Sequence, residues 1–144
     1  MKVDRTRIEQ LVPHAGAMCL LDGVMRWDAS SIACSADAPR HGHPLLRGGV
    51  LPAVAGCEYA AQAAAVHGAL LDAASAPRAG MLAKLMDVEL HLTNFARDEG
   101  AIRVCATLVS RADAGCIYSF AVAQQEEPVV SGRLMVAFAS PAST

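Results

Sequence analysis

Charged side chains are scarce in this sequence. Of its 144 residues, 18% are charged and 53% are hydrophobic, and the formal net charge is −2. No block or stripe of Lys and Arg is present, which argues against a nucleic-acid partner. The apolar fraction is slightly above typical usage and the charged fraction is well below it. We therefore expect part of the apolar surface to be buried between subunits, in a dimer or higher oligomer.

Long uncharged apolar runs are also missing. A helix that crosses a membrane needs roughly 18 or more such residues, and the most apolar stretch is interrupted by Glu58, Gln62 and His67. Residues 1–7 carry charges of both signs and contain no apolar segment of the kind found in signal peptides. We therefore expect a cytoplasmic protein that does not contact a membrane.

Paired cysteines are absent as well. The chain has five cysteines, an odd number, and none of them forms a C-x-x-C pair. This pattern argues against a disulfide framework and against a bound metal. We expect them to act as small hydrophobic side chains in a reducing compartment. They are Cys19, Cys34, Cys57, Cys105 and Cys116.

The order of apolar segments and turn residues predicts one domain over residues 1–139 and a frayed tail over residues 140–144. Turn-forming residues separate the segments. The pattern predicts helices over 5–11 and 53–71, and strands over 18–28, 32–38, 80–93, 101–110, 115–125 and 129–139. A curved antiparallel sheet wrapped round one long helix is the packing that this order favours, and it is an α+β architecture.

One glutamate stands out within the long predicted helix. Between Arg47 and Asp72, Glu58 is the only residue with a formal charge, and its neighbours are small and apolar. A helix that is apolar all round is usually buried. A buried carboxyl group without a partner tends to keep its proton and can then serve as a general acid. His43 lies fifteen residues upstream, in a loop rich in proline and glycine. The two residues form a candidate acid/base pair.

Several motifs resemble those of the FabZ-type (3R)-hydroxyacyl-carrier-protein dehydratases. Residues 11–14 read LVPH and residues 20–24 read LLDGV, which resembles the N-terminal "PH…LLvDrV" segment of that family. Residues 42–44 (GHP), 51–53 (LPA) and 58–62 (EYAAQ) resemble its "GHFPG…P…E-A-x-A-Q" pattern. The resemblance runs from about residue 10 to residue 68, with a weaker strand pattern to residue 138. It is closest to the short dehydratase-like proteins of polyene and related polyketide gene clusters.

The resemblance implies a hotdog fold and the dehydration of a 3-hydroxyacyl thioester to the trans-2-enoyl thioester. The expected substrate is attached to acyl carrier protein or to coenzyme A. The expected assembly is a homo-oligomer, or a heterodimer with another hotdog subunit. No metal or organic cofactor is expected, because the elimination needs only an acid, a base and a polarised carbonyl.

The same resemblance implies a role for individual residues. His43 would remove the C2 proton, and Glu58, acting in the site of the other subunit, would protonate the departing hydroxyl. Gln62, one helical turn after Glu58, would orient it. Backbone N–H groups near the start of the helix, from Gly49 to Ala53, would polarise the thioester carbonyl.

The loop after His43 departs from the family pattern. It is one residue longer before Pro52, and Ala53 replaces a glycine that is usual there. His41 is close enough in sequence to take the role of His43. Arg40 and Arg47 are candidate contacts for the phosphate of a carrier protein. Three alternatives stay open, and the altered loop motivates the first. They are a non-catalytic or half-site dehydratase-like subunit of a hotdog heterodimer, a hotdog acyl thioesterase, and a passive acyl-binding module.

Overall fold

The computed structural model describes residues 3–72, except 12–18, together with residues 80–97 and 99–138. Within these residues, seven strands form one antiparallel sheet in the order β1-β2-β3-β5-β6-β7-β4. The strands are β1 (Val3–Asp4), β2 (Gly23–Trp27), β3 (Ser31–Ala36), β4 (Gly80–Leu90), β5 (Ile102–Ala112), β6 (Gly115–Gln124) and β7 (Glu127–Phe138). The helices are α1 (Arg5–Leu11), the short 3-10 turn η2 (Ala53–Ala55) and α2 (Gly56–Leu71).

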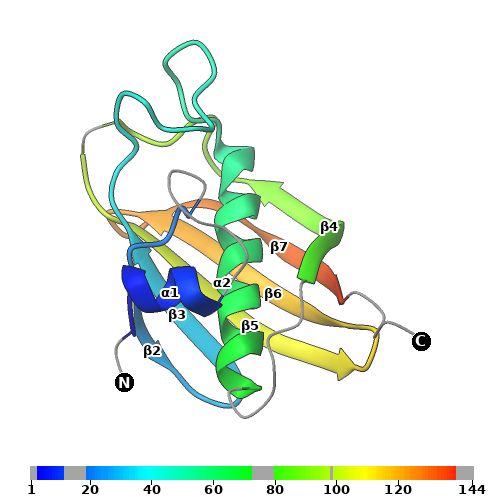
Figure 1. The fold of residues 1–144 in the computed structure, drawn as a ribbon. Coiled ribbons are helices and arrows are strands. Elements are labelled where there is room, and N and C mark those ends of the chain that lie inside the picture. The colour runs from blue at the N-terminus through cyan, green and yellow to red at the C-terminus, as the bar shows by residue number, and fades with distance from the viewer. Residues whose placement is uncertain (1–2, 12–18, 73–79, 98, 139–144) are drawn as a thin grey trace.

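The long helix α2 lies across one face of the sheet, and the short helix α1 lies beside it (Figure 1). Most residues of α2 are buried, because the helix contacts strands β3 to β7. The small side chains of α2 allow a close approach to the sheet. At Gly56, an added Cβ atom would lie 2.5 Å from Cγ1 of Val130. A glycine is therefore required where the helix begins.

The α+β class and the long helix after Pro52 are confirmed, and five of the predicted strands lie within a few residues of their expected positions. The strand expected over 18–28 begins only at Gly23, and the two-residue strand β1 was missed. The strand expected over 80–93 ends at Leu90 and contains a bulge, where Asp87 has a positive φ of 52°. Residues 140–144 lie outside the described residues, so the frayed tail stays a prediction.

All five cysteines are free thiols, and four of them are buried in the core, as expected of small hydrophobic side chains. Cys105 is half-buried. Among the described residues, no three His, Cys, Asp or Glu side chains are close enough to hold a metal ion. No helix of the described chain is long and apolar enough to span a membrane.

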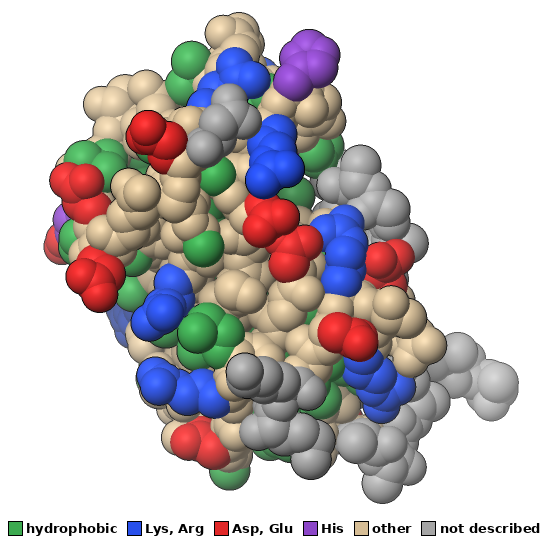
Figure 2. All heavy atoms as spheres, turned by 90° about the vertical axis from the view of Figure 1, so that its left-hand side faces the viewer, with side chains coloured by type: hydrophobic (Ala, Val, Ile, Leu, Met, Phe, Trp, Pro, Cys, Tyr) green, Lys and Arg blue, Asp and Glu red, His purple; other side chains and the backbone are tan. Residues whose placement is uncertain are grey.

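The two edges of the sheet differ. At one edge lies the short strand β1, and at the other lies β4, which has eleven residues and pairs with β7 on one side. Three leucines of β4, Leu82, Leu85 and Leu90, are exposed. By contrast, the face of the molecule shown in Figure 2 carries interspersed positive and negative side chains. With three exposed leucines beside charged residues, β4 is thus a candidate surface for contact with another subunit.

Candidate active site

His43 lies in the loop between β3 and η2, where a turn fixes its backbone. Its N–H donates to the carbonyl oxygen of Arg40 (2.9 Å), and its own carbonyl accepts from the N–H of Leu46 (3.3 Å). The backbone N–H of Leu45 donates to Nδ1 of the imidazole at 3.1 Å. The loop therefore holds both the main chain and the ring of His43.

The other ring nitrogen of His43 faces the helix. Nε2 lies 2.7 Å from the hydroxyl oxygen of Tyr59, and the two rings are stacked with centroids 6.0 Å apart. Because Nδ1 accepts the N–H of Leu45, a neutral His43 must carry its proton on Nε2 and donate it to Tyr59. The structure thus assigns the tautomer of this histidine.

Burial shifts the pKa values of both partners. It lowers the pKa of His43 below the ordinary value of 6.5, because an imidazolium loses more hydration than a neutral ring. It raises the pKa of Tyr59 well above the ordinary value of 10.0. At neutral pH the pair is therefore an uncharged imidazole and an uncharged phenol.

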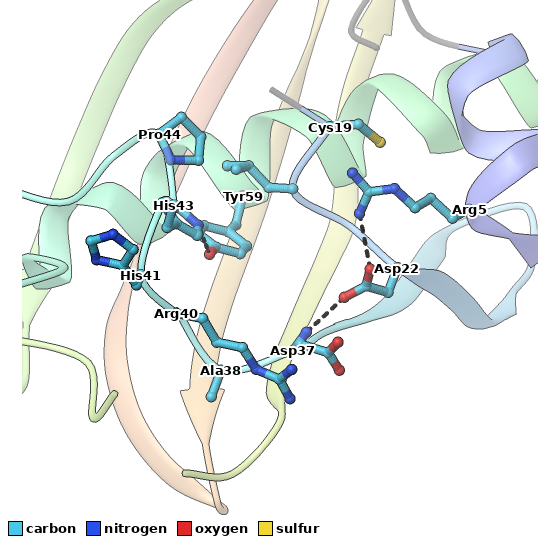
Figure 3. Close-up of a pocket in the computed structure, with 12 residues that line it drawn as sticks. Arg5, Cys19, Asp22, Asp37, Ala38, Arg40, His41, His43, Pro44 and Tyr59 are labelled. Carbon is cyan, nitrogen blue, oxygen red and sulfur yellow. Dashed lines mark hydrogen bonds and ion pairs between the residues drawn. The ribbon is translucent and has the colours of Figure 1, made fainter. Parts of the chain in front are cut away.

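A cavity of about 290 Å³ opens beside this pair (Figure 3). His43 and Tyr59 form part of its wall, together with the exposed residues His41 and Arg40. Asp22 lies on the opposite part of the wall and accepts hydrogen bonds from Nη1 of Arg5 (2.9 Å) and from the N–H of Asp37 (2.7 Å). Residues of α1, the segment before β2, the loop after β3 and the start of α2 thus line the cavity.

Glu58 precedes Tyr59 on α2 but does not share its cavity. It is half-buried, and it is absent from the described residues that line the cavity of His43. Glu58 is therefore less buried than its apolar neighbours in the sequence suggested, and Nε2 of Gln62 donates to its Oε1 at 3.3 Å. The same amide is held in place, since its Oε1 accepts the N–H of Leu20 at 2.9 Å. The contact predicted for Gln62 is therefore present, but one chain does not bring Glu58 and His43 to the same cavity.

The backbone donors expected from Gly49 to Ala53 are partly occupied. The N–H of Ala53 donates to the carbonyl of Thr93 at 2.9 Å. It is therefore engaged within the chain, which corrects its expected role as a free donor to a thioester. Gly49 has a positive φ of 78°, and its carbonyl accepts from Nη1 of Arg97 at 2.9 Å. Both residues fix the course of the loop as it enters the helix.

Comparison with known proteins identifies the family. The family model described as "ApeP dehydratase", of the ApeP-like proteins, matches residues 6–143. The chain belongs to the ApeP-like dehydratase family. A search of curated proteins found no match.

Solved structures show that this ApeP-like chain has the hotdog fold. The dehydratase heterocomplex ApeI:P from Xenorhabdus doucetiae is 22% identical with a TM-score of 0.84, and the match covers 92% of this chain and 91% of the other. A mutant thioesterase of Pseudomonas aeruginosa is 13% identical with a TM-score of 0.68, covering 94% and 93%. The PaaI protein of E. coli is 12% identical with a TM-score of 0.63, covering 92% and 90%. At these identities the structural likeness establishes the fold alone.

Sequence reasoning about the ApeP-like chain missed the contact of Tyr59 with His43. The residue stands directly after Glu58, where the resemblance has an alanine, and this departure from the pattern was the available signal. His14, the last residue of the LVPH segment, lies outside the described residues.

Proposed function

We propose that this chain is a subunit of a dehydratase that converts a 3-hydroxyacyl thioester to the trans-2-enoyl thioester, with the acyl group attached to acyl carrier protein. A coenzyme A thioester is the alternative form of the substrate. The observation that carries the proposal is the neutral His43 on the wall of a cavity in a member of the ApeP-like dehydratase family. A neutral imidazole is the form that can take up a proton.

In the proposed reaction, His43 takes the proton from C2 and the carbon–carbon double bond forms as the hydroxyl leaves C3. Glu58 donates the proton that turns this hydroxyl into water. Because Glu58 does not line the cavity of His43 in its own chain, the acid for each base would come from a neighbouring subunit. Gln62 would hold that carboxyl group through the contact at 3.3 Å.

The strand β4 is the surface that we propose for this assembly. Among the described residues it is a long edge strand that pairs with β7 on one side, and it carries three exposed leucines. Pairing with β4 of another hotdog subunit would continue the sheet and cover the apolar side chains. The neighbour ApeI:P is a heterocomplex, which supports a second hotdog subunit as the partner. A homodimer is the alternative assembly.

A specific observation favours a second candidate function, that of a subunit which acts only within a heterodimer. Both ring nitrogens of His43 are engaged, Nδ1 by Leu45 and Nε2 by Tyr59. A base in this state has no free lone pair, so the working base of the complex would come from the partner subunit. In that case this chain would supply Glu58 as the acid.

The test is a dehydration assay on a 3-hydroxyacyl thioester, followed by the absorbance of the enoyl product. The chain is assayed alone and together with a second hotdog dehydratase subunit from the same organism. His43→Ala and Glu58→Gln are compared with matched variants of exposed residues, His91→Ala and Glu127→Gln. Loss of turnover in both site variants, and in neither control, would support both proposed roles.

Other outcomes separate the candidates. Turnover that needs the partner and survives His43→Ala, but not Glu58→Gln, assigns this chain to the acid half of a heterodimer. Release of free thiol from an acyl thioester, without enoyl product, would instead make the protein a thioesterase. The absence of any turnover from a folded complex on carrier-bound and coenzyme A substrates would contradict the proposed function.

A further inference from the structure

The hydroxyl group of Tyr59 accepts a hydrogen bond and still has its own proton to donate. The backbone N–H of Leu45 occupies the lone pair of His43 Nδ1, so the neutral ring carries its proton on Nε2. Nε2 lies 2.7 Å from the phenol oxygen, which therefore accepts this proton. Among the described residues, the hydroxyl of Tyr59 makes no other hydrogen bond. Its O–H is thus left to donate to a group outside the described chain.

This O–H lies in the buried part of the cavity wall. Of the described residues that line the cavity, three are buried, namely Cys19, Leu20 and Tyr59. Leu20 has an apolar side chain, and the thiol of Cys19 donates to the carbonyl oxygen of Leu21 at 3.7 Å. Figure 3 shows the ring of Tyr59 reaching from α2 toward His43. Among these three side chains, the phenol is therefore the donor that a molecule in the cavity would meet.

The proposed reaction needs such a donor. When C2 of the acyl group loses its proton, negative charge develops on the carbonyl oxygen of the thioester, and hydrogen-bond donors aimed at that oxygen stabilise the charge. The backbone N–H of Ala53, which was expected to serve, instead donates to the carbonyl oxygen of Thr93 at 2.9 Å. A side-chain donor in the cavity would supply what this backbone group does not.

We propose that Tyr59 is a catalytic residue whose O–H donates a hydrogen bond to the carbonyl oxygen of the thioester while C2 loses its proton. This inference rests on the proposed function. The hydroxyl keeps its proton throughout, because burial holds the pKa of the phenol well above its ordinary value of 10.0. Tyr59 therefore stabilises charge and transfers no proton.

His43 strengthens the donor. A hydroxyl whose oxygen accepts a hydrogen bond becomes polarised and is a better donor through its own O–H. This relay holds whether the base is His43 or a group of the partner subunit. If His43 is the base, it takes the proton on Nδ1 in place of the contact with Leu45, and Nε2 keeps its proton toward Tyr59.

The structure offers a matched control. Tyr59→Phe removes the hydroxyl and keeps a ring that packs between His43 and Phe95, each with its centroid 6.0 Å away. Tyr118 is buried to the same 1% exposure, and its hydroxyl also lies 2.7 Å from a histidine nitrogen, Nδ1 of His67. Tyr118 does not line the described wall of the cavity. Tyr118→Phe therefore reports the loss of a buried hydroxyl as such.

The first measurement is dehydration of a 3-hydroxyacyl thioester by the active complex. We expect Tyr59→Phe to lower kcat about 10²- to 10³-fold, the usual loss when one such donor is removed. KM should change little, because the contact strengthens as the charge develops. Tyr118→Phe should keep the wild-type kcat per folded molecule. An unchanged kcat in Tyr59→Phe, or equal losses in the two variants, would overturn the proposal.

The second measurement does not require turnover. The probe is a saturated acyl-pantetheine thioester, labelled isotopically at the carbonyl carbon, whose carbonyl stretch is recorded by infrared difference spectroscopy. Donation from Tyr59 should lower the frequency of the bound carbonyl in the wild type and in Tyr118→Phe, but not in Tyr59→Phe. The same frequency in wild type and Tyr59→Phe would overturn the proposal, and together with a loss of kcat it would place the hydroxyl on another substrate atom. A lowered frequency in a wild-type complex without turnover would support the contact and contradict the proposed function.

Discussion

Two buried tyrosines bond to two histidines in this molecule, and the hydrogen bonds run in opposite directions. In both pairs the hydroxyl oxygen lies 2.7 Å from a ring nitrogen. Nε2 of His67 lies 2.8 Å from the carbonyl oxygen of Asp28, which can only accept. His67 therefore carries its proton on Nε2, and Tyr118 donates to the lone pair of Nδ1. At His43 the phenol is the acceptor.

The direction of each histidine–tyrosine hydrogen bond is set by a third group, which contacts the other ring nitrogen of the histidine. A carbonyl beside His67 fixes the proton on the nitrogen that faces it, whereas a backbone N–H beside His43 fixes the lone pair. His67 is 0% exposed and joins α2 to β6 and to the turn after β2, so its pair is part of the core. His43 is half-buried and lines the cavity. Of the two pairs, the one at His43 lines the cavity, and for this reason we propose a functional role for His43 and not for His67.

Substituting each of the two histidines should give the largest difference between the two pairs, in turnover and in stability. We expect His43→Gln to lower turnover about 10²- to 10⁴-fold, the usual contribution of a general base, while the protein stays folded. His67→Gln should keep turnover per folded molecule and lower stability. Dehydration assays on the active complex, paired with urea unfolding of each variant, measure both effects. Equal losses of turnover in the two variants would remove the functional distinction.

Removing the hydroxyl of Tyr118 should have the next largest effect. Tyr118→Phe leaves the buried lone pair of His67 Nδ1 without its donor, and an unsatisfied buried polar group costs about 1–3 kcal/mol. The free energy of unfolding should fall by that amount in urea titrations. Tyr59→Phe should cost less, because the half-buried His43 can find water. A larger loss in Tyr59→Phe than in Tyr118→Phe would show that the loop pair, and not the core pair, supports the fold.

Acid should weaken the fold through both histidines, with a smaller effect. Burial lowers the pKa of His43 and of His67 below 6.5 in the folded chain, so the unfolded chain binds protons first as the pH falls. Stability should therefore be greatest above pH 6.5 and decrease as the pH drops from there through the folded pKa values. Urea unfolding across this range measures the slope, and His67→Gln should reduce it. A slope that is the same in wild type and His67→Gln would assign the acid sensitivity to other groups.

The features that local sequence dictates were predictable. Small apolar residues after Pro52 indicated α2, and the spacing of Glu58 and Gln62 placed them one turn apart, where they do meet. Contacts that depend on the path of a loop were not predictable. The N–H of Ala53 is taken up by Thr93, which is distant in sequence. The meeting of His43 and Tyr59 likewise depends on the loop after β3 folding back onto the helix.

Alkylation of the free thiols in the core would show when the folded chain opens. Burial raises the pKa of Cys34 to about 12, so almost none of this thiol is present as the reactive thiolate while the chain is folded. A thiol buried between the sheet and α2, such as Cys34, becomes open to an alkylating reagent only when the two separate, whereas Cys19 lines the cavity of His43. The half-buried Cys105 can react without such separation. The number of alkylated cysteines measured over time would thus distinguish reaction at Cys105 on β5 from reaction that follows unfolding of the core.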